Sequence, residues 1–309
     1  MQIGMVGLGK MGMNMARRLL QDGHEVVAYN RSPAQTDALA KEYGGAIAAH
    51  TLEELVEALE PPRLVWLMLP AGQIVEEHIV LFTNLLSRGD VLIDGGNSRF
   101  RDDIRRARQL KKHGLHYVDA GVSGGIWGLE IGYCTMVGGE RDMFELLTPL
   151  LTSLAPENGF MYCGSHGAGH FVKMVHNGIE YGMMQAYAEG FALLDGSEYG
   201  KGLELSELAK LWNQGSVIRS WLLELTENAL ERDPHLINIA PYVEDSGEGR
   251  WTVEEAVRSA VPAPVLTLAL MERFRSRQSN SFADRLLSAL RNEFGGHAVR
   301  SAEDGAADD

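Results

Sequence analysis

The sequence has little cysteine and no long hydrophobic run. Its 309 residues include only two cysteines, Cys134 and Cys163, which are too few for a disulfide framework and are not spaced as metal ligands. No run approaches the roughly 18 apolar residues that a membrane span needs, and the first residues do not resemble a cleavable leader. We therefore expect a cytoplasmic protein that is not inserted in a membrane.

Positive charge is also scarce. The 28 Lys and Arg residues face 42 Asp and Glu residues, so the formal net charge is -14. Binding to nucleic acid requires clustered Lys and Arg, and this balance argues against nucleic acid as the main partner. A small anionic substrate responds only to local charge and is compatible with the composition. Hydrophobic residues make up 45% of the chain, enough to fill the cores of about two domains.

The first half alternates strand-like and helix-like segments. Short apolar strands are expected at 2–6, 25–30, 64–69, 90–94 and 115–120. A helix is expected after each of the first four, ending near Asp22 and then at about 34–43, 73–86 and 99–113. Segments 134–139 and 160–164 are also strand-like. The repeated strand-then-helix order predicts a mostly parallel, doubly wound sheet.

The pattern changes after Gly164. One long helix is expected from His166 to about Gly196, followed by helices at 204–213, 216–232, 252–260, 264–276 and 281–294. We predict an α/β Rossmann-type domain at 1–165, an all-helical domain at 166–298 and an acidic tail at 299–309.

A glycine-rich turn follows the first strand. Its residues match the pattern G-x-G-x-x-G and are Gly7, Leu8, Gly9, Lys10, Met11 and Gly12. A lone match is weak, but this one follows a strand, opens a helix and lies in a βαβ unit. Glycines in that context let the backbone approach a pyrophosphate at a helix N-terminus. The turn predicts a dinucleotide site.

The end of the second strand bears on the choice of cofactor. NAD enzymes usually place Asp or Glu there to accept a hydrogen bond from the ribose 2′-hydroxyl. This chain has Asn30, Arg31 and Ser32 instead, and Arg31 can pair with a 2′-phosphate. NADP is therefore favoured, whereas NAD is expected if Arg31 is only a solvated loop residue.

Polar and glycine-rich turns end three further strands. Ligands of open α/β sheets bind outside the carboxyl ends of the strands. We expect the residues at these ends to line one crevice: Leu69, Pro70, Asn97, Ser123, Gly124 and Gly125. Each turn alone is more often an ordinary tight turn than a site.

The long helix carries a polar stripe where an apolar one is usual. Lys173, His176, Asn177, Glu180 and Tyr181 fall at i, i+3, i+4, i+7 and i+8, which places them on one face. An exposed helix with an ordinary charge pattern is the alternative. Apolar residues elsewhere around the helix favour a stripe that lines a cleft, with an amine and a carboxylate two turns apart. His166 and His170 are also four residues apart, but no further ligand completes a first shell, so no metal site is expected.

These segments together resemble 6-phosphogluconate dehydrogenase, the decarboxylating enzyme family of the pentose phosphate pathway. The similar stretches are GLGKMGMNMA, NRS, DGGNS, GVSGG, GAGHFVKMVHNGIEYG and RNEFGGH, spanning residues 7 to 297. The run KMVHNGIEYG is specific to this family, whereas the wider β-hydroxyacid dehydrogenase superfamily shares only the glycine turns and the lysine.

The resemblance implies roles for the residues of the helix stripe. Lys173 would be the base that accepts the 3-hydroxyl proton while C3 gives up a hydride to NADP or NAD. Glu180 would be the acid that protonates the enediol left by decarboxylation. Asn177, His176, Asn97 and Ser123 to Gly125 would orient 6-phosphogluconate, and Tyr181 would contact its phosphate. It also implies a homodimer or homotetramer with shared active sites, in which Arg273 and the neighbouring subunit's equivalents of Arg291 and His297 reach the phosphate.

Two departures from the family pattern matter. Long members have about half as many residues again, so this chain resembles the short form. Where long members have K-G-T-G-K-W, this chain has Ser246-Gly247-Glu248-Gly249-Arg250-Trp251, and an acid in place of Thr puts that phosphate contact in doubt.

A dehydrogenase of an unphosphorylated 3-hydroxy acid is the alternative function, and a dinucleotide-sensing protein without turnover is a third.

Overall fold

The computed structural model describes residues 1–295 and 298–299. The chain forms two compact units, one of residues 1–180 and 247–262, the other of residues 181–246 and the described residues from Ala263 onward. The predicted boundary at residue 165 precedes α8 (Ala168–Asp195). The first unit continues along this helix to Glu180 and also includes α11 (Glu248–Arg258).

The first unit is built on an eight-stranded sheet with the order β3-β2-β1-β4-β5-β6-β7-β8. Every neighbouring pair is parallel except β6 and β7. The strands are β1 (Gln2–Val6), β2 (Glu25–Tyr29), β3 (Ala46–Ala49), β4 (Leu64–Leu67), β5 (Val91–Asp94), β6 (His116–Ser123), β7 (Cys134–Gly139) and β8 (Phe160–Gly164). The predicted mostly parallel, doubly wound sheet followed by a helical part is confirmed.

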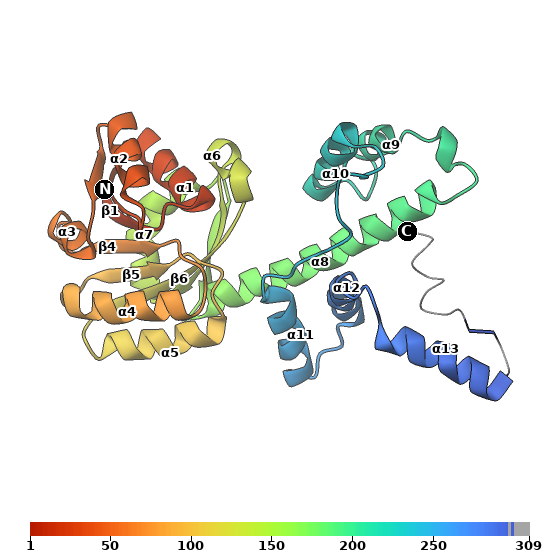
Figure 1. The fold of residues 1–309 in the computed structure, drawn as a ribbon. Coiled ribbons are helices and arrows are strands. Elements are labelled where there is room, and N and C mark those ends of the chain that lie inside the picture. The colour runs from red at the N-terminus through yellow and green to blue at the C-terminus, as the bar shows by residue number, and fades with distance from the viewer. Residues whose placement is uncertain (296–297, 300–309) are drawn as a thin grey trace. The chain divides into compact units, whose positions relative to one another are not determined.

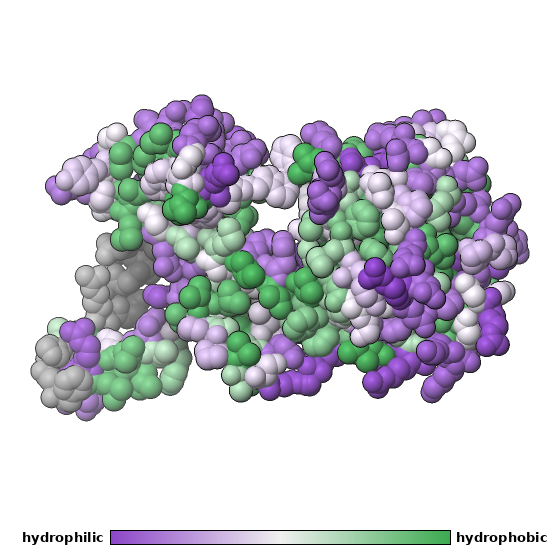
Figure 2. Space-filling model, turned by 180° about the vertical axis from the view of Figure 1, so that it is seen from behind, coloured by the Kyte–Doolittle hydropathy of each residue, from purple (hydrophilic) through white to green (hydrophobic). Residues whose placement is uncertain are grey.

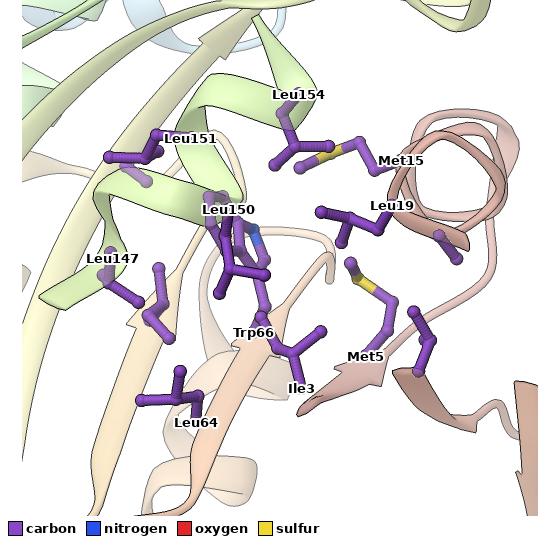
Figure 3. Packing of buried hydrophobic residues seen from close by; sticks show 14 of the residues in the cluster. Ile3, Met5, Met15, Leu19, Leu64, Trp66, Leu147, Leu150, Leu151 and Leu154 are labelled. Carbon is purple, nitrogen blue, oxygen red and sulfur yellow. The ribbon is translucent and has the colours of Figure 1, made fainter. Parts of the chain in front are cut away.

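Helices cover both faces of the sheet (Figure 1). One face packs against α1 (Lys10–Gln21), α2 (Pro33–Glu42) and α7 (Arg141–Leu154). Figure 3 shows Met15 and Leu19 of α1 and four leucines of α7 against Ile3, Met5, Leu64 and Trp66 of the sheet. The other face packs against α3 (Leu52–Glu57), α4 (Gln73–Leu85) and α5 (Phe100–Lys111). Burial on both faces explains why the strands are continuous apolar runs.

Several elements of the first unit were not predicted from the sequence. The strand β3 and the helices α3, α6 (Gly128–Ile131) and α7 lie in segments where the sequence pattern predicts no helix or strand. The start of α3 has a recognisable signal, because the hydroxyl of Thr51 accepts from the backbone N–H of Glu54 at 3.1 Å, as in a capping box. The predicted helix at 252–260 begins earlier, at Glu248.

The described residues of the second unit form helices joined by loops, and none of them forms a strand. It contains the end of α8, α9 (Leu205–Trp212), α10 (Trp221–Arg232), α12 (Pro264–Arg275) and α13 (Phe282–Gly295). Its buried core is small and consists of Phe191, Ala209, Leu223 and Leu230. Many of its apolar side chains are exposed, including the face of α13 at the lower left of Figure 2. None of the described helices has the length and apolar character needed to cross a membrane.

Candidate active site

The carboxyl ends of β1, β4 and β5 meet at one edge of the sheet. The register pairs Val6 with Leu67, and Leu67 with Asp94. The predicted residues after these strands therefore lie along the same edge, with Leu69 close enough that a Cβ at Gly96 would lie 2.6 Å from its carbonyl oxygen. Asn97 and Pro70 are exposed there.

The glycine turn after β1 has the shape that a dinucleotide needs. A Cβ at Gly12 would lie 2.0 Å from the carbonyl oxygen of Gly7, so only glycine lets α1 start this close to the strand. A Cβ at Gly9 would meet nothing within 4 Å, which leaves open space at the helix start. Gly9 is the N-cap of α1 and supplies no side-chain cap. The first N–H groups of the helix can therefore bind a pyrophosphate.

Of the three residues after β2, Asn30 makes hydrogen bonds within the fold, whereas Arg31 and Ser32 are exposed. The Asn30 amide oxygen accepts from the backbone N–H of Leu8 at 3.0 Å, and its amide nitrogen donates to Gln35. Asn30 thus ties the glycine turn to the start of α2. Arg31 and Ser32 are exposed, and no carboxylate occupies the last position of β2 or these three residues. The turn after β2 therefore presents a cation and a hydroxyl to solvent and no carboxylate.

The first turn of α8 is held directly on the sheet. The carboxylate of Asp119, in β6, accepts from the backbone N–H groups of Gly167 at 2.6 Å and His170 at 3.0 Å. A Cβ at Gly121, two residues farther along β6, would lie 2.4 Å from the Cβ of Lys173. The bare backbone at Gly121 therefore lets Lys173 sit against β6, just before the predicted Ser123–Gly125 turn.

The polar stripe of α8 is a linked set of side chains. Lys173 and Asn177 are buried, at 7% and 8% exposure, and the Nζ of Lys173 donates to the Oδ1 of Asn177. The Nδ1 of His176 lies 2.9 Å from the same oxygen and 3.9 Å from the carboxylate of Glu180. His176 and Glu180 are half-buried. The structure thus brings together the four residues that the sequence predicted as catalytic.

Burial lowers the pKa of the Lys173 amine and is the largest influence on it. The carboxylates of Glu180 and Glu248 raise this pKa, but by less. A lysine with a lowered pKa can accept a proton near neutral pH. The site therefore has the electrostatics of a general base.

A buried network of charges joins the start of α8 to the turn after β5. Arg106 donates to Asp94 at 2.9 Å and lies 3.5 Å from Asp103. Asp103 pairs with the Nδ1 of His170 at 2.8 Å. Asp94 also accepts from the backbone N–H of Gly96 at 3.0 Å, in the turn that carries Asn97.

The network perturbs the pKa values of two of its neighbours. Burial lowers the pKa of His170, but the carboxylates of Asp103, Asp94 and Asp119 together outweigh it and raise the pKa to about 10. Burial, helped by the nearby charge of Asp103, raises the pKa of Asp119 to about 6. Asp94, Asp103 and His170 have the mutual spacing of metal ligands, but the guanidinium of Arg106 already pairs with both carboxylates.

The predicted phosphate ligands lie in the second unit. Tyr181 is buried, and the guanidinium of Arg273 stacks 3.6 Å from its ring centroid while donating to the carbonyl of Glu244 at 2.7 Å. Arg291 is exposed on α13. His297 lies outside the described residues.

One buried acid at the site was not among the predicted site residues. Glu248 begins α11, is 2% exposed, and accepts from the Nδ2 of Asn177 at 3.0 Å. The sequence marked this position only as a departure from a family pattern. Its contact with α8 depends on a long-range packing that local sequence does not reveal.

Family models match both halves of the chain. The model described as the NAD binding domain of 6-phosphogluconate dehydrogenase matches residues 2–164. The model described as the 6-phosphogluconate dehydrogenase C-terminal domain matches residues 169–285. The two matches together cover most of the sequence.

Individual relatives agree with the family models. A Bacillus subtilis (strain 168) protein provisionally named 6-phosphogluconate dehydrogenase is 46% identical over 97% of this chain and 99% of its own. A Haloferax volcanii protein named NAD(+)-dependent, decarboxylating 6-phosphogluconate dehydrogenase is 43% identical over 98% of this chain and 100% of its own. The solved Plasmodium falciparum 6-phosphogluconate dehydrogenase is 30% identical, with a TM-score of 0.81, over 98% of this chain and 67% of its own.

The pKa of His170 predicts an alkaline loss of stability. The folded state holds this proton up to a pKa of about 10, against an ordinary 6.5, so the stabilisation is complete below pH 6.5 and is lost as pH rises through about 10. A full proton changes the free energy of unfolding by about 1.4 kcal/mol per pH unit. Urea unfolding across this window should show a flatter pH dependence in His170→Asn than in wild type.

A matched substitution at an exposed histidine serves as the control. His235 is mostly exposed, 3.8 Å from Asp195, and His235→Asn should keep the wild-type slope. Parallel curves for wild type and His170→Asn would contradict the assignment.

Proposed function

The chain belongs to the family of 6-phosphogluconate dehydrogenases, and from that premise we propose that it converts 6-phosphogluconate to ribulose 5-phosphate and CO2. NADP or NAD is reduced in the reaction. The observation that carries the proposal is the buried Lys173–Asn177 pair, with Lys173 against Gly121 of β6 and Glu180 one turn beyond Asn177 on the same helix. An amine base and a carboxylic acid on one face suit a reaction with an early deprotonation and a late protonation.

Lys173 acts as the base in the first step. Its Nζ takes the proton of the 3-hydroxyl while C3 is oxidised to a ketone, and the bound nicotinamide supplies the hydride acceptor for this oxidation. Burial favours the neutral amine that the step requires. Asn177 holds the amine through its Oδ1, which keeps the nitrogen in a defined position before and after it gains the proton.

Decarboxylation and protonation follow. The 3-keto acid loses its C1 carboxylate as CO2, and the protonated Lys173 hydrogen-bonds to the C3 oxygen that gains negative charge. Glu180 then donates a proton to the carbon that becomes C1 of ribulose 5-phosphate. Its half-buried carboxyl group, next to His176, can exchange its proton with solvent after each turnover.

A dehydrogenase of an unphosphorylated 3-hydroxy acid is the second candidate. It is favoured by one observation, that the buried Glu248 stands where long members of the family have a phosphate-binding Thr. An assay with 6-phosphogluconate and with gluconate, each with NADP and with NAD, separates the two. Reduced nicotinamide and CO2 in equal amounts from 6-phosphogluconate alone support the main proposal.

NADP is the favoured cofactor of this proposal. The turn after β2 offers the exposed cation of Arg31 and the hydroxyl of Ser32, and it has no acid to bind a free 2′-hydroxyl. NAD is the alternative, and the Haloferax volcanii relative is named as NAD(+)-dependent.

A second copy of the chain completes each site in the proposed assembly. The face of α13 exposes Phe282, Leu286, Leu287 and Leu290, and an apolar face of this kind marks an interaction site. Arg291 lies on the same helix. Its cation, with Arg273 and His297, would bind the dianionic phosphate in a molecule whose formal charge is -14.

Replacement of Lys173 tests the base. Lys173→Ala should lower kcat by about 10² to 10⁴, the usual cost of losing an acid or base. The affinity for the dinucleotide should be unchanged, because Lys173 lies outside the glycine turn. Steady-state assays measure kcat, and cofactor titration measures the affinity for the dinucleotide. Lys201→Ala, a change at an exposed lysine, is the control. More than a tenth of wild-type turnover in Lys173→Ala would rule out the role.

Reversal of the charge at Arg31 tests the cofactor assignment. Arg31→Glu should weaken NADP binding by about tenfold or more, because a charge-assisted hydrogen bond contributes roughly 1.5 to 3 kcal/mol. NAD should then be preferred. Fluorescence titration with both cofactors measures the change, and Arg108→Glu, the same charge change on an exposed side chain of α5, is the control. Equal NADP affinity in wild type and Arg31→Glu would show that Arg31 does not contact the phosphate.

Mixed subunits test the shared site. Lys173→Ala and Arg291→Ala chains, each inactive alone, should regain partial activity when combined, because one site of a mixed dimer has both residues intact. Differently tagged chains allow the heterodimer to be purified before assay. Lack of complementation in that species would mean that α13 serves its own subunit.

A further inference from the structure

The buried acid at the start of α11 is packed against the catalytic face of α8. Thr252 of α11 donates its hydroxyl to the backbone carbonyl of Met174 at 3.0 Å. A Cβ at Gly178 would lie 2.7 Å from the side chain of Thr252, so the two helices touch where Gly178 has no side chain. This close packing brings the carboxylate of Glu248, one turn before Thr252, to Asn177.

The second half of α11 makes two ion pairs to the first turn of α5. Arg99 pairs with Glu254 at 2.7 Å, and Arg101 pairs with Glu255. Both arginines lie at the beginning of α5, directly after the turn that carries Asn97. α11 is thus tied to two elements of the site, and Glu248 has little freedom to move.

The hydrogen bonds of Asn177 depend on which way its amide points. The Nδ2 donates to Glu248 at 3.0 Å, while the Oδ1 accepts from Lys173 and lies 2.9 Å from the ring nitrogen of His176. A carboxylate only accepts hydrogen bonds, so Glu248 selects the amide nitrogen as its neighbour. The opposite orientation would place the NH₂ group against the amine of Lys173 and leave two donors facing each other.

We infer that Glu248 is a positioning residue for the proposed reaction, because it fixes the amide of Asn177 with its oxygen toward Lys173 and so holds the catalytic amine. The identity of Lys173 as the base rests on the proposed function. The contact between Glu248 and Asn177 does not.

The charge of Glu248 also bears on the protonation of Lys173. The charged groups that act on this amine are Glu180 from α8, Glu248 from α11 and Cys134 from β7. His176 of α8 lies against the same Asn177 oxygen and 3.9 Å from Glu180. Burial lowers the pKa of Lys173, and the carboxylates of Glu180 and Glu248 counter it. Removal of the charge at Glu248 should therefore lower the pKa of Lys173 further.

Two substitutions separate the hydrogen bond from the charge. Glu248→Gln keeps an oxygen that can accept from Asn177 but has no charge, so kcat should stay within about threefold of wild type while the acid limb of the pH–rate profile moves to lower pH. Glu248→Ala removes the acceptor, and kcat should fall about ten- to hundredfold, the scale of a small misplacement of a catalytic group. The affinity for the cofactor should be unchanged in both variants.

The control is the same change at a glutamate that makes no contact with α8 or α11. Glu53 of α3 is exposed, so Glu53→Gln should keep the wild-type kcat and pH profile. Thermal unfolding of all variants shows whether a loss of activity comes from a loss of folded protein.

A second readout does not depend on turnover. The rate of acetylation of Lys173 by acetic anhydride, followed by peptide mass spectrometry as a function of pH, reports the neutral fraction of the amine. The midpoint should lie at lower pH in Glu248→Gln than in wild type and Glu53→Gln. This readout applies even if wild type does not convert 6-phosphogluconate, an outcome that would reject the proposed function but not the positioning role.

Two outcomes would overturn the inference. One is a wild-type kcat in folded Glu248→Ala. The other is a Glu248→Gln protein whose acid limb and acetylation midpoint both coincide with wild type, which decides the question even if Glu248→Ala does not fold.

Discussion

The attachment of the first turn of α8 to β6 is the interaction on which the site depends. Asp119 accepts two backbone N–H groups of that turn, which would otherwise be unsatisfied at a buried helix start. Gly121 then lets the helix approach until Lys173 lies against the strand. These two contacts determine where the amine of Lys173 is located and, through helix geometry, where Asn177 and Glu180 follow. The polar stripe of α8 is therefore positioned by a strand that carries none of its side chains.

The buried charged residues next to this attachment are paired with one another. Isolated buried charges are costly, and they are retained when they are paired and hydrogen-bonded. Arg106 neutralises part of the negative charge of Asp94 and Asp103, and His170 pairs with Asp103. Asp94 at the same time fixes the turn after β5 through Gly96 and Ser98. One network thus connects the turn that carries Asn97 with the helix that carries Lys173, so the two sides of the substrate site are held together.

The sequence by itself determined the elements whose signals are local. The alternation of apolar runs and helices gave the parallel sheet, and the glycine turn after β1 gave the start of α1, because sterics at Gly7 and Gly12 leave no other residue type. The spacing of Lys173, His176, Asn177 and Glu180 placed them on one face, since the helix repeat is fixed by backbone hydrogen bonding. Weaker local signals were missed: β3 is only four residues long, and α7 contains Pro149 inside the helix, which disfavours a helix prediction.

Only the tertiary structure decided what surrounds that face. The position of α11 follows from the fit of Thr252 against Gly178 and from two ion pairs to α5, between residues about 150 positions apart in sequence. No periodicity connects Glu248 with Asn177, so the sequence showed this acid only as an unusual residue in a familiar segment. The roles of Asp119 and Gly121 were hidden for the same reason. Local patterns fix which face of a helix is polar, but burial, pKa and hydrogen-bond partners depend on which distant segment packs against it.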